Sequence, residues 1–173
     1  MKQEATETKV TNQLVQDCAS FASAYSGNNY FTDLAEFLAK ETDVEYVLIG
    51  YLNNGHATTV TTAALFAHGK IVDNMVYSLA GTPCENVMGR NCCYYPVNVQ
   101  QMFPNDKELQ ELNINSYIGA PLFDTEKNPL GIVVLMDSET IPNAGILEKA
   151  LEAIAPRTEI ELQLYLSQIE TEV

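Results

Sequence analysis

Hydrophobic residues near the start of the chain recur every three or four positions, the spacing of a helix with one apolar face. They predict a helix over residues 4–25, which the polar residues 26–29 end. A second helix is expected over residues 30–40, with Asn29 or Thr32 as its N-terminal cap.

The same helical spacing returns over residues 143–169 and takes a heptad-like form towards the end of the chain. Pro156 lies inside this stretch. Proline removes a helical hydrogen bond and clashes with the preceding turn, so a kink or a break is expected there.

Between these helices the pattern changes to runs rich in β-branched and aromatic residues, which are typical of strands. Residues 44–52 and 58–67 are expected to form a hairpin around the turn Asn53-Asn54-Gly55. A third strand is expected over residues 71–72 and 75–79, and residues 117–123 and 130–137 predict a last hairpin. The fold class is α+β, with one central antiparallel sheet of five to six strands and helices packed on one face.

Residues 81–115 are irregular, because Pro83, Gly89, Pro96 and Pro104 break any long element. Short helices fit residues 84–88 and 107–112. Irregular stretches of this length in a compact domain are usually functional. We expect this insert to cover the other face of the sheet as a cup.

Three segments carry a resemblance to a known family. They are Gly81-Thr82-Pro83-Cys84-Glu85, Ser116-Tyr117-Ile118-Gly119-Ala120-Pro121-Leu122-Phe123-Asp124, and Pro129-Leu130-Gly131. Over residues 25–168 the chain resembles a GAF domain of the kind found in bacterial sensor kinases and cyclic-dinucleotide signalling proteins. The family implies a cup that can bind a small molecule, and terminal helices that join neighbouring domains, often through a parallel dimer.

This resemblance gives an expected domain organisation. Residues 1–25 would be a linker and dimerisation helix, residues 26–155 the GAF core, and residues 156–173 a C-terminal signalling helix. The expected partners are an unknown small molecule, a second copy of the chain, and the output domain of a larger signalling protein.

The charge of the chain limits its other partners. It has 9 Lys and Arg against 23 Asp and Glu, a formal net charge of −14. Phosphate backbones and anionic membrane surfaces would repel it, so neither nucleic acid nor a membrane is expected. The start of the chain lacks a signal-peptide core, and four cysteines are few, which favours reduced thiols in the cytoplasm.

Candidate ligand-binding residues come from the insert and the strands expected to face it, and aromatic residues with a polar tip would suit a semi-polar ligand. Ordinary core packing is the alternative for each. No cofactor is expected. The candidates are Phe66, His68, Tyr77, Cys84, Tyr94, Tyr95, Phe103, Ser116 and Tyr117.

A thiol enzyme is the first alternative to a non-catalytic sensor. Cys84 follows Pro83 at a predicted helix start, where the helix dipole would lower its thiol pKa. The GAF family includes free methionine sulfoxide reductases, in which Cys84 would act with Cys92 or Cys93 as resolving thiol. These enzymes carry a further cysteine before the penultimate strand and a pair of aspartates in the last strand. Here only Asp137 of these is present.

Metal and chromophore sites are not expected. Cys84, Cys92 and Cys93 with His56 or His68 could supply zinc ligands, but their spacing does not fit a standard site. No cysteine is followed by histidine, as in bilin-binding GAF domains, and the Asp-Glu pair of cyclic-nucleotide sites is missing. A purely structural dimerisation module, with its cup filled by its own side chains, is the second alternative.

Overall fold

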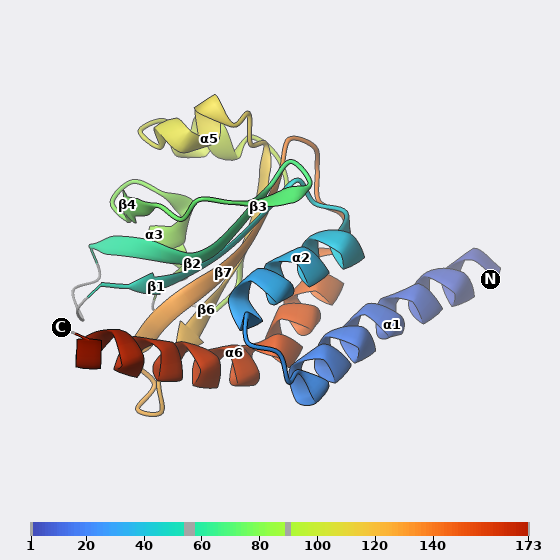
Figure 1. Cartoon of the computed structure of the whole chain (residues 1–173). Coiled ribbons are helices and arrows are strands. Elements are labelled where there is room, and N and C mark those ends of the chain that lie inside the picture. The colour runs from blue at the N-terminus through green and yellow to red at the C-terminus, as the bar shows by residue number, and fades with distance from the viewer. Residues whose placement is uncertain (1, 54–57, 89–90, 173) are drawn as a thin grey trace. The chain divides into compact units, whose positions relative to one another are not determined.

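The structure, a computed structural model, describes residues 2–53, 58–88 and 91–172, with side chains from residue 12 onward. The chain divides into two compact units (Figure 1). The sheet unit comprises Asn29–Pro142, and the terminal unit joins the residues up to Asn28 to those from Asn143 onward. No helix within the described ranges combines the length and the apolar content needed to cross a bilayer.

The sheet unit is built on seven strands that pair antiparallel, which confirms the predicted α+β class. Their order is β3-β2-β1-β7-β6-β5, with β4 beside β2. The strands are β1 (Tyr46–Leu52), β2 (Thr59–Ala67), β3 (Lys70–Val72), β4 (Val76–Ser78), β5 (Cys93–Tyr95), β6 (Ser116–Phe123) and β7 (Pro129–Asp137). Both predicted hairpins are present. Asn54 and Gly55 of the first predicted turn, and His56 after it, lie outside the described residues.

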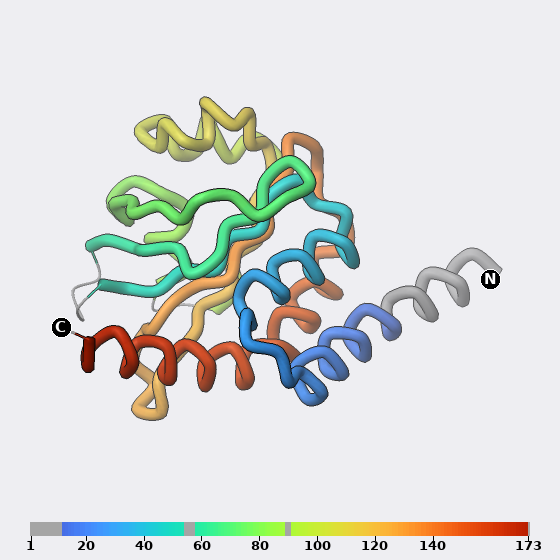
Figure 2. Tube along the Cα trace, viewed as in Figure 1, coloured from blue at the N-terminus to red at the C-terminus, as the bar shows by residue number. Residues whose placement is uncertain are grey.

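The two stretches predicted as the third strand, residues 71–72 and 75–79, correspond to two separate short strands, β3 and β4. Both pair with β2, β3 at one end and β4 at the other (Figure 2). Thr62 explains the break: its hydroxyl donates to Asn74 Oδ1 at 2.9 Å and accepts from the Met75 amide at 2.9 Å. This buried threonine side chain therefore hydrogen-bonds the segment that separates the two strands.

Helix α2 (Tyr30–Thr42) covers one face of the sheet and contacts β1 and β2. Its buried residues are Tyr30, Leu34, Ala35, Leu38 and Ala39. Asn29 is the N-cap but makes no side-chain capping bond. Instead the Thr32 hydroxyl donates to the Asn29 carbonyl at 3.0 Å.

The insert lies on the other face, as predicted, and carries α3 (Pro83–Val87), α4 (Val99–Met102) and α5 (Lys107–Glu111) (Figure 1). The predicted short helices correspond to α3 and α5. Asp106 starts α5, because its Oδ1 accepts from the Leu109 amide at 3.3 Å. Helix α4 and strand β5 were not predicted, since each is too short to show a period.

The terminal unit consists of α1 (Lys2–Ala24) and α6 (Ala144–Glu172), which pack against each other. The predicted break at Pro156 is wrong, because α6 continues through it. Buried residues lie on both sides of the proline, with Leu151 and Ile154 before it and Leu162 after it. Burying this stripe outweighs the cost of an internal proline, about 3 kcal/mol.

Arg157 should be important for the pairing of α1 and α6. Its guanidinium donates to the Ala22 carbonyl at 3.0 Å and to the Tyr25 carbonyl at 3.1 Å, where α1 ends. Such carbonyls have no partner within their own helix. We expect Arg157→Ala to destabilise this pairing by about 1 to 2 kcal/mol, seen as faster hydrogen exchange over residues 18–25. Lys149→Ala, an exposed change on the same helix, is the control, and equal exchange in both variants would contradict the assignment.

Candidate functional site

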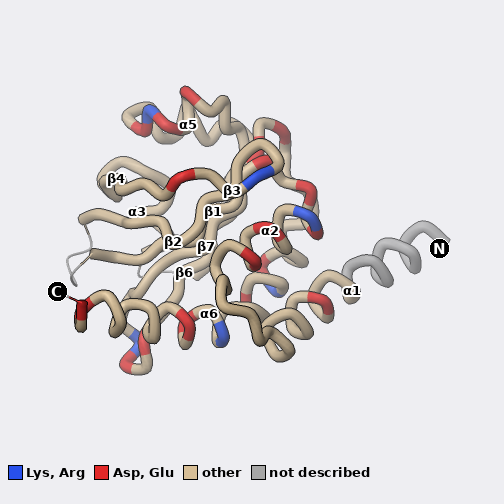
Figure 3. The backbone as a smooth tube through the Cα atoms, viewed as in Figure 1, with Lys and Arg blue, Asp and Glu red and all other residues tan. Residues whose placement is uncertain are grey.

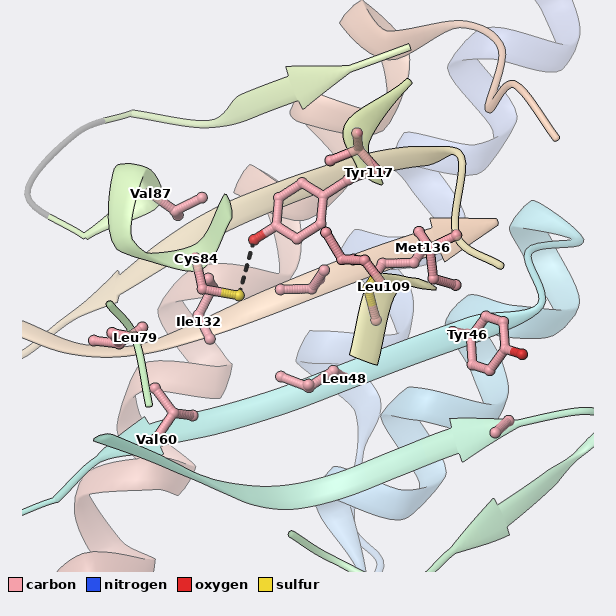
Figure 4. Close-up of a cluster of buried hydrophobic side chains, with 14 of the residues drawn as sticks. Tyr46, Leu48, Val60, Leu79, Cys84, Val87, Leu109, Tyr117, Ile132 and Met136 are labelled. Carbon is pink, nitrogen blue, oxygen red and sulfur yellow. Dashed lines mark hydrogen bonds between the residues drawn. The ribbon is translucent and has the colours of Figure 1, made fainter. Parts of the chain in front are cut away.

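A cavity of about 270 Å³ lies between the sheet and the insert. Strands β1, β2, β6 and β7 provide most of its floor, and α3 and α5 provide its cover (Figure 4). Its lining is mainly apolar. The lining residues are Tyr46, Leu48, Leu65, Ala67, Val72, Met75, Tyr77, Pro83, Cys84, Asp106, Glu108, Leu109, Glu111, Leu112, Ile114, Tyr117, Val134 and Met136.

Strand register explains which residues reach this cavity. Directly paired residues in an antiparallel sheet point to the same face. One row across the sheet runs through Ala67, Tyr46, Met136 and Tyr117, and all four line the cavity. Alternate residues point to the other face. The row through Phe66, Val47, Leu135, Ile118 and Tyr94 therefore faces away from the cavity.

One part of the cavity wall is a thiol–phenol cluster, formed by Tyr77, Cys84 and Tyr117. The Tyr77 hydroxyl donates to Cys84 Sγ at 3.3 Å, and the Tyr117 hydroxyl donates to the same sulfur at 3.2 Å (Figure 4). Gly119 makes room for the second contact, because a Cβ atom there would lie 2.6 Å from the Tyr117 hydroxyl oxygen. The cluster thus depends on a β6 glycine two residues after its own tyrosine.

All three groups of the cluster are neutral at neutral pH. Burial raises the pKa of the Cys84 thiol, and the hydrogen bonds from Tyr117 and Tyr77 oppose this less strongly. Burial, followed by the neighbouring Cys84, also raises the pKa of Tyr77 and Tyr117 well above the usual value. The predicted lowering of the Cys84 pKa by the helix start is therefore wrong, because desolvation outweighs the dipole of a five-residue helix.

Cys84 should consequently react slowly with alkylating agents. We expect iodoacetamide at about pH 8 to modify native Cys84 at least ten-fold more slowly than the same cysteine in urea-unfolded protein, because only the thiolate reacts. Peptide mass spectrometry resolves Cys84 from Cys92 and Cys93. Rapid labelling of native Cys84 would show instead that the thiol is accessible and ionised.

The edge of the cavity formed by α5 is acidic. Burial raises the pKa of Asp106 to about 6, and the neighbouring Glu108 adds to this, while the bond from the Leu109 amide opposes it. Glu108 and Glu111 also line this edge but are exposed. No Lys, Arg or His belongs to the lining in the part of the chain that the structure describes.

Comparisons with known proteins agree with this architecture. The GAF sensor protein from Burkholderia vietnamiensis superposes with a TM-score of 0.66 at 11% identity, over 87% of this chain and 92% of that one. The phycocyanobilin-bound GAF domain from a cyanobacterial phytochrome gives 0.61 at 14% identity, over 91% and 96%. The chain has the GAF fold.

Two further comparisons bear on what GAF domains of this shape do. Free methionine-R-sulfoxide reductase from Neisseria meningitidis superposes with a TM-score of 0.69 at 11% identity, over 88% of each chain. Hybrid signal transduction histidine kinase F from Dictyostelium discoideum is 26% identical over 155 residues, which are 88% of this chain and 13% of that protein. The chain thus spans about an eighth of the length of this relative. No family model matches the sequence.

Within this GAF fold, three of the nine predicted ligand-binding residues line the cavity: Tyr77, Cys84 and Tyr117. Phe66 and His68 instead line a shallow groove beside α2. His68 does contact one of the cavity-lining residues, because its Nε2 lies 2.9 Å from the Tyr46 hydroxyl.

The other four predicted residues do not line the cavity. Tyr95 packs edge-to-face on Phe103, with ring centroids 5.2 Å apart, and its ring centroid lies 5.9 Å from that of Tyr117. Ser116 accepts from the Ile141 amide at 3.0 Å, and the Tyr94 hydroxyl donates to the Ile141 carbonyl. Ser116 and Tyr94 therefore hold the segment that follows β7.

Of the residues named for thiol chemistry, Cys84 lines the cavity, whereas Cys92, Cys93 and Asp137 do not. The Asp137 carboxylate accepts from the amides of Glu45 at 3.0 Å and Glu139 at 2.8 Å and does not line the cavity. Cys92 and Cys93 are half-buried, and the Cys93 thiol donates to the Asn86 carbonyl at 3.6 Å. His56 lies outside the described residues, and among those that are described no group of three or more His, Cys, Asp or Glu side chains could hold a metal ion.

Sequence reasoning missed most of the cavity floor and its acidic edge. Tyr46 and Leu48, and likewise Val134 and Met136, are alternate residues of single strands, so their spacing marks a common face. Both faces of these strands are apolar, however, so the sequence does not tell which face meets the insert. Asp106 could have been found from the sequence, because an aspartate directly before a short helical pattern is a typical N-cap residue.

Proposed function

We propose that this chain is a sensory GAF domain that binds a small molecule in the cavity beneath the insert, and that it belongs to a larger signalling protein. The observation that carries the proposal is the cavity itself, of about 270 Å³. Well-packed interiors hold few voids larger than a water molecule, and an empty cavity lowers the stability of the fold. A cavity of this size therefore supports ligand binding.

The cavity is more consistent with ligand binding than with a purely structural module. In such a module the cup would be filled by its own side chains. Here apolar walls and a few polar groups surround an open volume, the usual composition of a small-molecule site. The volume is at the lower end of the range for such sites, which favours a small ligand.

We further propose that the terminal segments, residues 1–25 and 156–173, relay the signal and form a homodimer. Ile160 and Leu164 support this, because they are large apolar residues one turn apart on α6 and more than half exposed. The similarity to a hybrid histidine kinase supports an output domain elsewhere in the same protein. A ligand can shift such a system only by binding one of its states more tightly.

A thiol reductase is less well supported, although one structural neighbour is such an enzyme. The Cys84 thiol is 6% exposed and its pKa is raised by burial, which opposes the thiolate that attack on a sulfoxide requires. Asp137 is occupied by two backbone amides. We therefore propose binding without catalysis.

The proposal can be tested by thermal unfolding in the presence of cellular small molecules. The protein is mixed with chromatographic fractions of the small-molecule extract of its host. A ligand of the folded state should raise the unfolding midpoint by mass action, by several degrees at saturating concentration. If no fraction raises the midpoint, the ligand-binding proposal loses its support.

A further inference from the structure

The hydrogen-bonding groups that line the cavity are carboxyl, phenol and thiol groups. Asp106, Glu108 and Glu111 provide the carboxyls, and no amide or basic side chain is among the described lining residues. Carboxylates only accept hydrogen bonds. The wall is therefore able to hold positive charge and unable to neutralise negative charge.

The phenol groups strengthen this asymmetry. The hydroxyl protons of Tyr77 and Tyr117 are directed at Cys84 Sγ, so towards a ligand each oxygen offers its lone pairs. Tyr46 is also engaged, with its oxygen 2.9 Å from His68 Nε2. A ligand carboxylate or phosphate would find few donors here and would be buried beside like charges, which is costly.

The acidic edge is partly desolvated, and no basic side chain among the described residues lines it. Asp106 is 8% exposed, and one of its oxygens caps α5. Its carboxyl also bonds the backbone and the side chain of Glu108. A carboxylate accepts several hydrogen bonds, so an ammonium group can bond these two acids as a further donor. Lys107 is the basic residue on α5, but it does not line the cavity. Figure 3 marks the positions of acidic residues on this helix in red, and the net charge of −14 would also attract a cation.

The cavity volume limits the size of the ligand. An apolar cavity of about 150 Å³ is enough to bind benzene. A volume of about 270 Å³ therefore holds roughly ten or eleven non-hydrogen atoms when scaled from that case. This is one ring with a short chain, and it is too small for a nucleotide or a tetrapyrrole.

We infer that the ligand is a small apolar amine, with its ammonium group at the edge formed by Asp106, Glu108 and Glu111 and its body against the strands. This inference rests on the proposed function, since it names the ligand class of the same cavity. The ammonium replaces the repulsion between neighbouring carboxyls with charge-assisted hydrogen bonds. The apolar body is buried against side chains such as Leu65 and Val134.

Amine binding should weaken below about pH 6. The titratable groups that act on Asp106 are Glu108 on α5, Tyr77 on β4 and Cys84 on α3, and none of them is basic. Lys107, the next residue along the chain, is basic but exposed, and it does not line the cavity. The pKa of Asp106 in the free protein is about 6, and a bound cation lowers it. Amine affinity is then fully present above this value and should fall about ten-fold by pH 5, whereas the affinity of a neutral analogue should not change.

Methyl NMR of ¹³C-methionine protein gives a direct test with three matched probes. These are 2-phenylethylamine, the neutral 2-phenylethanol and the anionic 3-phenylpropanoate. Met75 and Met136 line the cavity, and Met102 is 55% exposed outside it. We expect the amine to shift the Met75 and Met136 methyl signals saturably, about ten-fold more tightly than the alcohol, with Met102 unchanged and the carboxylate inactive.

Variants locate the charge. Asp106→Asn keeps a residue that can cap α5 but removes the negative charge. It should abolish most of the preference for the amine over the alcohol, measured as the ratio of the two affinities in the same variant. Glu36→Gln, an exposed acid on α2, is the control and should keep the preference.

The outcomes separate this inference from the proposed function. Equal binding of amine and alcohol, or stronger binding of the carboxylate, would overturn the amine assignment while leaving a ligand-binding cavity intact. No shift of Met75 or Met136 with any probe would also overturn it. The unfolding experiment with cellular fractions decides the proposed function independently, because it assumes no ligand class.

Discussion

Replacing Gly119 by alanine is expected to lower the free energy of unfolding by about 2 to 3 kcal/mol. The added Cβ would lie 2.6 Å from the Tyr117 hydroxyl oxygen and 2.9 Å from two of its ring carbons. Tyr117 is 1% exposed and lines the cavity, so its ring can relieve this contact only by moving into the cavity. The ring would have to leave Cys84 Sγ and disturb the cavity wall. Urea unfolding followed by circular dichroism measures the change.

Gly145→Ala is the matched control for this prediction. A Cβ at Gly145 meets no atom within 4 Å, and the residue lies in α6, where alanine is favoured over glycine. Its stability should equal or slightly exceed that of the natural chain. Should Gly119→Ala prove as stable as Gly145→Ala, the Tyr117 ring does not lie over β6 as described.

Filling the cavity with Ala67→Phe should weaken the binding of benzene, a neutral probe of its apolar part, by at least about ten-fold. Ala67 lies in the row of paired residues that faces the cavity and is 9% exposed. A phenyl ring there would occupy more than half of the volume, judged by the size of cavity that holds benzene. The methyl signals of Met75 and Met136 report the binding.

Val76→Phe controls for the aromatic ring itself. Val76 is on β4 of the same sheet, is 62% exposed and does not line the cavity. This variant should bind benzene like the natural chain. If Ala67→Phe also does so, the apolar volume lies elsewhere than between β2 and the insert.

Much of the fold could be predicted because it depends on strong local patterns. The long helices show a clear period, and both main hairpins join runs of β-branched residues. The failures had non-local causes. Pro156 is tolerated because residues on both sides of it are buried. The predicted third strand is two strands, β3 and β4, because the Thr62 side chain from another strand bonds Asn74 and Met75 between them.

The site was only partly predictable for a related reason. Tyr77, Cys84 and Tyr117 stood out as polar groups within or beside the insert, and they do meet. Tyr46 and Met136 could not be assigned, because the strands that carry them are apolar on both faces and the sequence does not say which face the insert covers. The pKa of Cys84 was misjudged because burial depends on β4 and β6, which are distant in sequence from α3.

Native mass spectrometry of the purified chain tests the central claim most directly. The natural protein and Ala67→Phe are prepared side by side, and each is compared with its denatured form. The account predicts a non-covalent small mass on the natural chain, absent from Ala67→Phe, and a dimeric subunit count for both. A natural chain without added mass, under conditions that preserve the dimer, would contradict ligand binding, and so would the same added mass on both proteins.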